Sequence, residues 1–108
     1  MSSEISPSQF KKEWDGGRRP FVLDVRRQEE WDVSNLKEFG AKLIPLHELE
    51  ARYSEIPPDA DIVVHCKGGV RSLQAQSFLQ SKGYSKVQNF TGGILRYCEE
   101  VDPSKPTY

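Results

Sequence analysis

The chain has 108 residues, a length that fits one compact domain, and we expect residues 1–108 to form it. Hydrophobic residues make up 36% and charged residues 29%, enough for a core beneath a polar surface. Because 15 Lys and Arg face 16 Asp and Glu, the formal net charge of -1 offers no electrostatic basis for a nucleic-acid or anionic-membrane partner.

Short apolar runs alternate with helical patterns along the chain. Runs bounded by turn signals predict strands around Ile5 and at residues 20–25, 42–44, 61–65 and 86–90. Apolar residues at helical spacing predict a helix after a Ser6 cap, one turn at 28–31, and helices at 46–53, 71–82 and 93–101. This alternation predicts an α/β fold with a small, mostly parallel sheet of about five strands flanked by helices.

The termini and the two cysteines bear on where the protein acts. No apolar region typical of a signal peptide follows Met1, and no stretch approaches the roughly 20 apolar residues that span a bilayer. We therefore expect a cytoplasmic protein without a membrane partner, in which Cys66 and Cys98 stay reduced. The number and spacing of Cys and His residues predict no metal site.

One segment combines the features that chemistry needs, His65-Cys66-Lys67-Gly68-Gly69-Val70-Arg71-Ser72. The preceding strand places Cys66 at the carboxyl edge of the sheet, where open α/β folds bind ligands. Gly68 and Gly69 allow the backbone to curl so that several N–H groups converge. The start of the next helix and the cations Lys67 and Arg71 favour the thiolate form of the cysteine. We therefore predict that Cys66 is a nucleophile held in a cradle of backbone amides.

Glycine-rich turns between a strand and a helix also bind phosphates, so a nucleotide site is an alternative for this loop. The chain contains neither Gly-x-x-x-x-Gly-Lys nor Gly-x-Gly-x-x-Gly. The loop therefore indicates no nucleotide site.

The spacing of Cys66 and Arg71, with four residues between them, resembles the six-residue active-site loop of the rhodanese family. Related phosphatases and arsenate reductases place five residues between Cys and Arg, so the shorter loop implies a cradle for one sulfur atom. The segments 23–26, 29–31 and 89–94 are similar to other parts of the family, and the resemblance runs from about Ile5 to Tyr108. It implies a rhodanese-like fold.

The same resemblance assigns roles to further residues. Lys67, Gly68, Gly69, Val70 and Arg71 form the substrate-binding loop behind the nucleophile Cys66. Asp24, Arg26 and Ser72 are supporting residues. The two from the first buried strand position the active-site region through ion pairs, and a strand-end salt bridge without a catalytic role is an equally open interpretation.

The family resemblance implies a sulfurtransferase of the thiosulfate (rhodanese) type that needs no cofactor. It moves sulfane sulfur from thiosulfate or a protein persulfide to a nucleophilic acceptor through a Cys66 persulfide. Residues 42–46 and 101–106 look most like the rhodanese domain fused to adenylyltransferases, which serves molybdopterin, thiamine or tRNA thiolation. A protein-to-protein sulfur relay with weak thiosulfate activity is therefore one alternative. A non-catalytic binding or redox-sensing module is another, disfavoured by the intact Cys66 and Arg71.

Two positions depart from the family pattern. Residues 35–41 replace the usual His-(Ile/Leu)-Pro-Gly-Ala, which predicts a reshaped loop on the rim of the site. Tyr97 stands where the family has Trp and keeps an aromatic anchor.

We predict a buried, hydrogen-bonded imidazole for His65, and an exposed position without a partner for His47. We predict a packed helix cysteine for Cys98, with a resolving thiol as the less favoured alternative.

Overall fold

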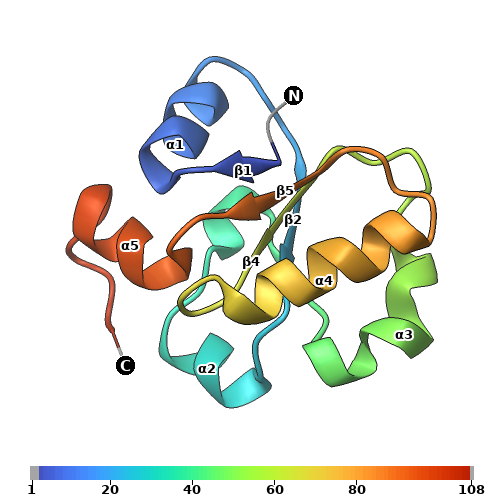
Figure 1. The fold of residues 1–108 in the computed structure, drawn as a ribbon. Helices are drawn as coiled ribbons and strands as arrows, with labels where there is room; N and C mark the ends of the chain where they lie inside the picture. The colour runs from blue at the N-terminus through green and yellow to red at the C-terminus, as the bar shows by residue number, and fades with distance from the viewer. Residues whose placement is uncertain (1–2, 108) are drawn as a thin grey trace.

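Five strands form the centre of the molecule in a computed structural model that describes residues 3–107. The strands are β1 (Glu4–Ile5), β2 (Phe21–Asp24), β3 (Lys42–Leu43), β4 (Ile62–His65) and β5 (Val87–Phe90). They lie in the order β1-β5-β4-β2-β3, and each neighbouring pair is parallel (Figure 1). The predicted fold class, an α/β fold with a five-stranded sheet, is confirmed.

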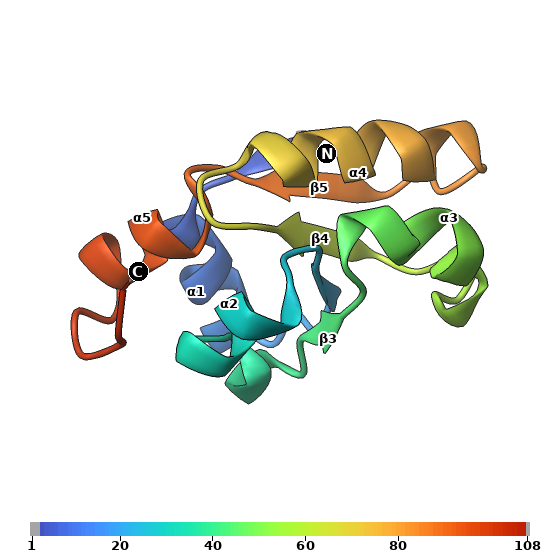
Figure 2. The ribbon, with the colours of Figure 1, turned by 90° about the horizontal axis from the view of Figure 1, so that it is seen from below.

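Helices cover both faces of this sheet. They are α1 (Pro7–Asp15), α2 (Gln28–Val33), α3 (Leu49–Arg52), α4 (Val70–Ser81) and α5 (Gly93–Glu100). Figure 2 shows α3 and α4 on one face, with α1 and α5 on the other. The chain moves in opposite directions along the sheet after β4 and after β2, because β4 is followed by β5 on one side and β2 by the edge strand β3 on the other.

Two apolar cores follow from the alternation of side chains along the buried strands. Leu23 and Val64 face the core beneath α3 and α4, which also contains Ala75 and Leu79 of α4. Val22 and Val63 face the core beneath α1 and α5, whose other members include Phe10, Phe90, Ile94 and Tyr97. The central strands are therefore buried on both sides, as their continuous apolar sequence predicts.

The start of α1 confirms the predicted cap. Ser6 accepts a hydrogen bond from the Gln9 backbone N–H at 3.1 Å, and Pro7 occupies the first helical position. The side chain of Gln9 instead donates to Glu13 at 2.7 Å. Half of a capping box therefore forms at this end of the helix.

The predicted helix over residues 46–53 is wrong in detail. The segment is a 3-10 turn at Leu46–Glu48, the single α-helical turn α3, and a second 3-10 turn at Tyr53–Glu55. Apolar residues three apart, such as Leu46 and Leu49, align in a 3-10 turn as well as in an α-helix. Their spacing therefore cannot distinguish the two.

The unusual segment 35–41 packs inward. It forms a 3-10 turn at Lys37–Phe39, and Leu36 and Phe39 are buried in the core under α1 and α5. The Phe39 ring meets the rings of Phe10 and Tyr97 edge to face, at centroid distances of 5.1 and 5.9 Å. This contact gives Tyr97 the anchoring position that the sequence predicts for it.

The helices of residues 3–107 are all too short or too polar to span a membrane.

Candidate active site

The candidate site lies at the carboxyl end of β4 beside that of β2, where the chain leaves the two strands in opposite directions. In open parallel sheets this arrangement leaves a crevice at the strand ends. Cys66 follows β4 directly, and Val25 follows β2 and donates its N–H to the His65 carbonyl at 3.1 Å. The sheet therefore places the predicted nucleophile where such folds bind ligands.

Two backbone N–H groups donate hydrogen bonds to the Cys66 sulfur. Cys66 is only 1% exposed, and its Sγ accepts hydrogen bonds from the N–H of Gly69 at 3.0 Å and of Ser72 at 3.4 Å. Gly69 has φ 107, a left-handed conformation that glycine adopts without strain and that turns its N–H toward the sulfur. The predicted amide cradle is present, and Ser72 extends it by one residue.

The carbonyl groups of the same loop point the other way, toward the start of α5. Ile94 N–H donates to the Cys66 carbonyl at 2.9 Å, and Leu95 N–H donates to the Lys67 carbonyl at 3.3 Å. The carbonyl of each trans peptide is antiparallel to the next N–H, so these bonds also fix where the N–H groups of Lys67 and Gly68 point. The start of α5 thus orients the cradle from behind.

Close approach of these two segments requires a glycine at position 93. An ideal Cβ at Gly93 would lie 2.3 Å from the Lys67 carbonyl oxygen, and the residue has φ 65. Any side chain there would push α5 and the loop apart. The Gly92-Gly93 turn therefore belongs structurally to the candidate site.

Arg71 is held by the acidic turn of α2. Its guanidinium pairs with Glu30 in a bidentate geometry, with N–O distances of 2.6 and 2.8 Å, and both side chains are partly buried. The sequence predicts Arg71 as a charge near the sulfur. In the structure it also ties the start of α4 to α2 across the crevice.

Asp24 and Arg26 form a fully buried ion pair beneath this crevice. Arg26 Nη2 donates to Asp24 Oδ2 at 2.7 Å, Arg26 Nε donates to Oδ1 at 2.9 Å, and both side chains are 0% exposed. Arg26 Nη2 also donates to the Ser34 carbonyl at 2.8 Å, just after α2. The pair connects the end of β2 to the residue that follows α2.

His65 lies deep in the same region, and part of its prediction is wrong. The ring is buried as predicted, but neither ring nitrogen has a hydrogen-bond partner among residues 3–107. Nε2 lies 3.7 Å from Asp24 Oδ2. Burial lowers the pKa of His65, and the Asp24 carboxylate opposes this shift only in part. Arg26 already occupies Asp24, which explains why the imidazole has no bond to it.

The second cysteine lies in the other core. Cys98 packs beneath α1 and α5 with Phe90 and Ile94, whereas Cys66 belongs to the core beneath α3 and α4. Both thiols are free, and burial raises the pKa of Cys98. This placement favours the prediction of a packed cysteine over that of a resolving thiol.

Two residues that the sequence does not predict as site residues also lie near the loop. Asn89 of β5 accepts a hydrogen bond from Ser72 Oγ at 2.5 Å. His47, predicted to be exposed and without a partner, is exposed but lies 3.4 Å from Glu48 and lines a cavity near the loop. The β5 sequence Val-Gln-Asn-Phe contains two polar residues, so the pattern alone does not mark Asn89.

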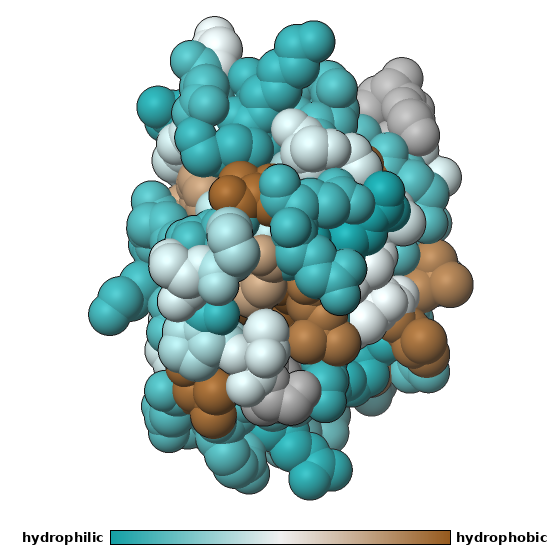
Figure 3. All heavy atoms as spheres, turned by 90° about the vertical axis from the view of Figure 1, so that its left-hand side faces the viewer, coloured by the Kyte–Doolittle hydropathy of each residue, from teal (hydrophilic) through white to brown (hydrophobic). Residues whose placement is uncertain are grey.

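The cavity beside the loop has a volume of about 230 Å³. It is lined by Val25, Arg27, Leu46, His47 and Arg71. A second cavity of about 450 Å³ shares Arg27 and His47 with it. The side chain of the loop residue Val70 is 70% exposed. The surface on the side of α1 and α5 is mainly hydrophilic, with small separate apolar areas (Figure 3).

Among residues 3–107, no group of three or more His, Cys, Asp or Glu side chains is placed to hold a metal ion.

Comparison with known proteins places the chain in a family. The model of the Rhodanese-like domain matches residues 6–100. The chain belongs to the rhodanese-like domain family. The predicted resemblance is confirmed.

Curated relatives include proteins of very different length. A rhodanese-like/PpiC domain-containing protein of Arabidopsis thaliana is 41% identical over 81% of this chain and 30% of its own length. The probable adenylyltransferase/sulfurtransferase MoeZ of Mycobacterium tuberculosis is 32% identical over 98% of this chain and 27% of its length. The chain thus spans about a third or less of these two. A sulfurtransferase of Allochromatium vinosum is 32% identical over 95% of this chain and 94% of its own.

Solved structures agree with the family. The human single-domain sulfurtransferase TSTD1 superimposes with a TM-score of 0.79 and 27% identity, over 93% of this chain and 98% of that one. A rhodanese-related protein of Thermoplasma volcanium gives a TM-score of 0.82 at 26% identity, over 93% and 94% of the two chains. The rhodanese-like fold therefore accounts for nearly the whole chain.

Proposed function

We propose that the chain acts as one rhodanese domain and transfers sulfane sulfur through a persulfide on Cys66. The observation that carries this proposal is the cradle of backbone N–H donors directed at the Cys66 sulfur. Such donors stabilise negative charge on sulfur in a site that excludes water. Family membership supports the choice of sulfur as the transferred atom.

In the first step the Cys66 thiolate attacks the outer sulfur of thiosulfate. A new S–S bond forms to Cys66, the S–S bond of thiosulfate breaks, and sulfite leaves with the electron pair. The product is an anionic Cys66 persulfide, so the total charge is unchanged. We assign Lys67, Gly68, Gly69, Val70 and Arg71 to the binding of this anion through backbone amides and loop charge.

In the second step a nucleophilic acceptor takes the outer sulfur. It attacks that sulfur, the persulfide bond breaks, and Cys66 leaves as the thiolate from which the cycle began. The cavity lined by Arg27, His47 and Arg71, in which Arg71 is paired with Glu30, provides the approach to the loop for the donor or acceptor. Asp24, Arg26 and Ser72 support the loop. No cofactor takes part in this scheme.

The test is thiosulfate-dependent formation of thiocyanate from cyanide. We expect the purified protein to catalyse it, and Cys66→Ser to reduce the rate to the uncatalysed background. Cys98→Ser is the matched control, because Cys98 lies in the other core, and it should retain activity within about twofold. Unchanged turnover in Cys66→Ser would refute the assignment.

A protein-to-protein sulfur relay is a second candidate, favoured by the similarity to MoeZ over nearly the whole chain. Its donor would be a protein persulfide, and thiosulfate would be a poor substitute. Kinetics separate the two. A high thiosulfate KM together with rapid sulfur uptake from a cysteine desulfurase indicates the relay, whereas saturation at low thiosulfate indicates the small-molecule reaction.

A further inference from the structure

The side chain of Asn89 touches both residues that hold the Cys66 sulfur. It extends from β5, is buried, and its backbone is fixed between Glu4 of β1 and Val64 of β4. Its Oδ1 lies 2.5 Å from Ser72 Oγ, and its Nδ2 donates to the Gly69 carbonyl at 3.4 Å. Asn89 itself reaches the sulfur only through these two neighbours.

The Gly69 carbonyl decides which way the Asn89 amide faces. A backbone carbonyl is only an acceptor, so the group of Asn89 that faces it must be the NH2. The opposite orientation would bring two acceptor oxygens together. The carbonyl oxygen of Asn89 therefore faces Ser72, and as a pure acceptor it must receive the hydroxyl proton of Ser72.

This arrangement fixes what Ser72 can offer to the sulfur. Ser72 Oγ lies 3.4 Å from Cys66 Sγ, within reach of a hydrogen bond that involves sulfur. A hydroxyl has a single proton, and that proton is directed to Asn89. The hydroxyl therefore turns a lone pair toward Sγ, where it can accept from an S–H but cannot donate to a thiolate.

We propose that Asn89 is a positioning residue that acts through Ser72 to hold the resting Cys66 as a thiol. This inference rests on the proposed role of Cys66 as the nucleophile. The backbone N–H groups of Gly69 and Ser72 favour negative charge on the sulfur, and the Ser72 lone pair opposes it. Asn89 thus restrains a nucleophile that the loop otherwise activates.

The ionisable groups around the loop remain the same when Asn89 is replaced. They come from the loop and α4, from the ends of β2 and β4, from α2, and from the cavity: Lys67, Arg71, Asp24, Arg26, His65, Glu30, Arg27 and His47. A change in the pH profile of Cys66 on replacing Asn89 therefore reports the hydrogen bonds of Asn89 to Ser72 and Gly69, and a Ser72→Ala background separates the two.

The experiment measures the rate of alkylation by iodoacetamide against pH, in a Cys98→Ser background so that Cys66 alone reacts. Asn89→Leu, close to Asn in shape, and Asn89→Ala both free the Ser72 hydroxyl to donate to the thiolate. We expect the midpoint of the profile to fall by about one pH unit. Because a less basic thiolate is a weaker nucleophile, alkylation should be about threefold faster below the midpoint and about threefold slower on the plateau.

These crossing profiles separate positioning from a loosened fold, which would change the rate in one direction at all pH values. In a Ser72→Ala background, Asn89→Leu should cause no further shift, since its effect passes through Ser72. Gln88→Ala is the control, a buried neighbour on the same strand that points to the opposite face and should leave the midpoint unchanged.

A midpoint that stays in place or rises in both Asn89 variants would overturn the proposal, as would an equal shift in the Ser72→Ala background. Alkylation needs no sulfur donor. If Cys66→Ser retained transfer activity, the proposed function would fail, whereas an unshifted alkylation midpoint sinks only the role of Asn89.

Discussion

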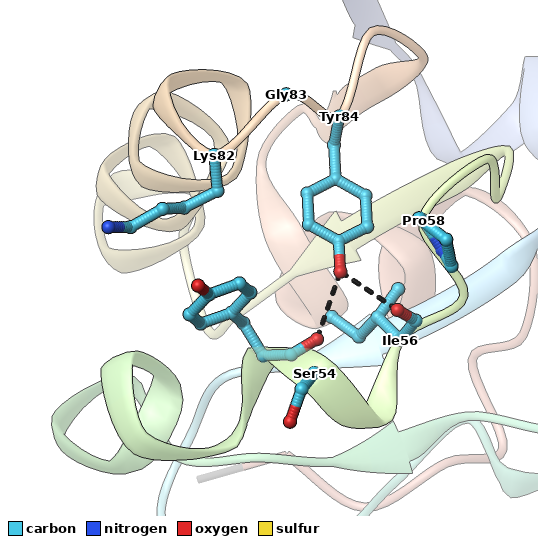
Figure 4. A pocket seen from close by; sticks show the side chains of 7 residues that line it. Ser54, Ile56, Pro58, Lys82, Gly83 and Tyr84 are labelled. Carbon is cyan, nitrogen blue, oxygen red and sulfur yellow. Dashed lines mark hydrogen bonds between the residues drawn. The ribbon is translucent and has the colours of Figure 1, made fainter.

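The carboxyl and amino ends of the parallel sheet carry different kinds of residues and contacts. The carboxyl end holds the buried Asp24–Arg26 pair, the Cys66 loop and the Gly92-Gly93 turn. The amino end has a hollow of about 330 Å³ lined by Tyr53, Ser54, Ile56, Pro58, Lys82, Gly83 and Tyr84 (Figure 4). In that hollow the Tyr84 hydroxyl reaches the carbonyls of Tyr53 and Ile56 at 3.0 and 2.8 Å, which joins the end of α4 to the segment after α3.

The hollow at the amino end is larger than the cavity beside the loop and smaller than the adjoining cavity of about 450 Å³, and its polar groups serve the fold. The tyrosine hydroxyl bonds to backbone, and the Lys82 ammonium lies 5.7 Å from the Tyr53 ring and 5.6 Å from the Phe78 ring. At the carboxyl end, backbone N–H groups converge on one sulfur atom. The convergence of donors on a nucleophile, and not the size of a hollow, therefore distinguishes the candidate site.

We expect the largest effect on stability from a comparison of two bidentate Arg–Asp pairs, one at each end of the sheet. Asp24→Ala removes the carboxylate that neutralises the buried Arg26 and should lower the free energy of unfolding by about 3–5 kcal/mol. Asp61→Ala breaks the partly exposed Arg18–Asp61 pair and should cost about 0.2–1 kcal/mol. Urea denaturation measures both. Equal losses would contradict the contrast in burial.

The next effect compares two glycines with positive φ. Gly93→Ala should lower sulfur transfer about 100-fold, because its Cβ would displace the carbonyl that orients the cradle. Gly83 at the amino end has φ 95 and open space around it, so Gly83→Ala should cost about 1–2 kcal/mol of stability and leave kcat unchanged. Full activity in Gly93→Ala would show that α5 does not position the loop.

A third prediction concerns the buried His65 and the pH dependence of stability. Burial holds the pKa of His65 below its ordinary value of 6.5, so the unfolded chain binds a proton that the folded chain does not. His65 therefore makes the protein less stable as pH falls below about 6.5, by up to about 1.4 kcal/mol per pH unit. His65→Phe should flatten this part of the pH profile. Thermal unfolding of both proteins between pH 5 and 8 measures this dependence. A slope of stability against pH that is the same in His65→Phe and in the unmodified protein would contradict the prediction.

The smallest effect is at the amino end. Tyr84→Phe removes the hydroxyl that binds the carbonyls of Tyr53 and Ile56, and should lower stability by about 1 kcal/mol. Thiocyanate formation should stay within about twofold of the unmodified protein, because this end takes no part in the proposed chemistry. A large loss of activity in Tyr84→Phe would instead connect the hollow to catalysis.

The sequence predicts those features that depend on neighbours along the chain. The buried strands follow from their apolar runs, the start of α1 from Ser6, and the curl after β4 from its glycines and the four-residue gap to Arg71. The partners of these features come from distant segments. Glu30 reaches Arg71 from α2, and a local pattern does not contain that pairing.

The contacts of Asn89 and His65, which the sequence does not predict, also depend on residues from distant segments. Asn89 is one of two polar residues in β5, beside Gln88, and only the packing of β5 against α4 shows that it meets Ser72. His65 is predicted to find a hydrogen-bond partner, but Arg26 takes the nearby Asp24 carboxylate. A buried polar residue can have several possible hydrogen-bond partners, and the tertiary structure determines which of them it contacts.

The most direct test of the central proposal is mass spectrometry of the protein after incubation with thiosulfate. The account predicts that the peptide containing Cys66 gains about 32 Da, the mass of one sulfur atom, and loses it on addition of cyanide. The peptide containing Cys98 should stay unmodified. Thiocyanate formation without any added mass on Cys66, or sulfur carried on Cys98 instead, would contradict a Cys66 persulfide as the intermediate.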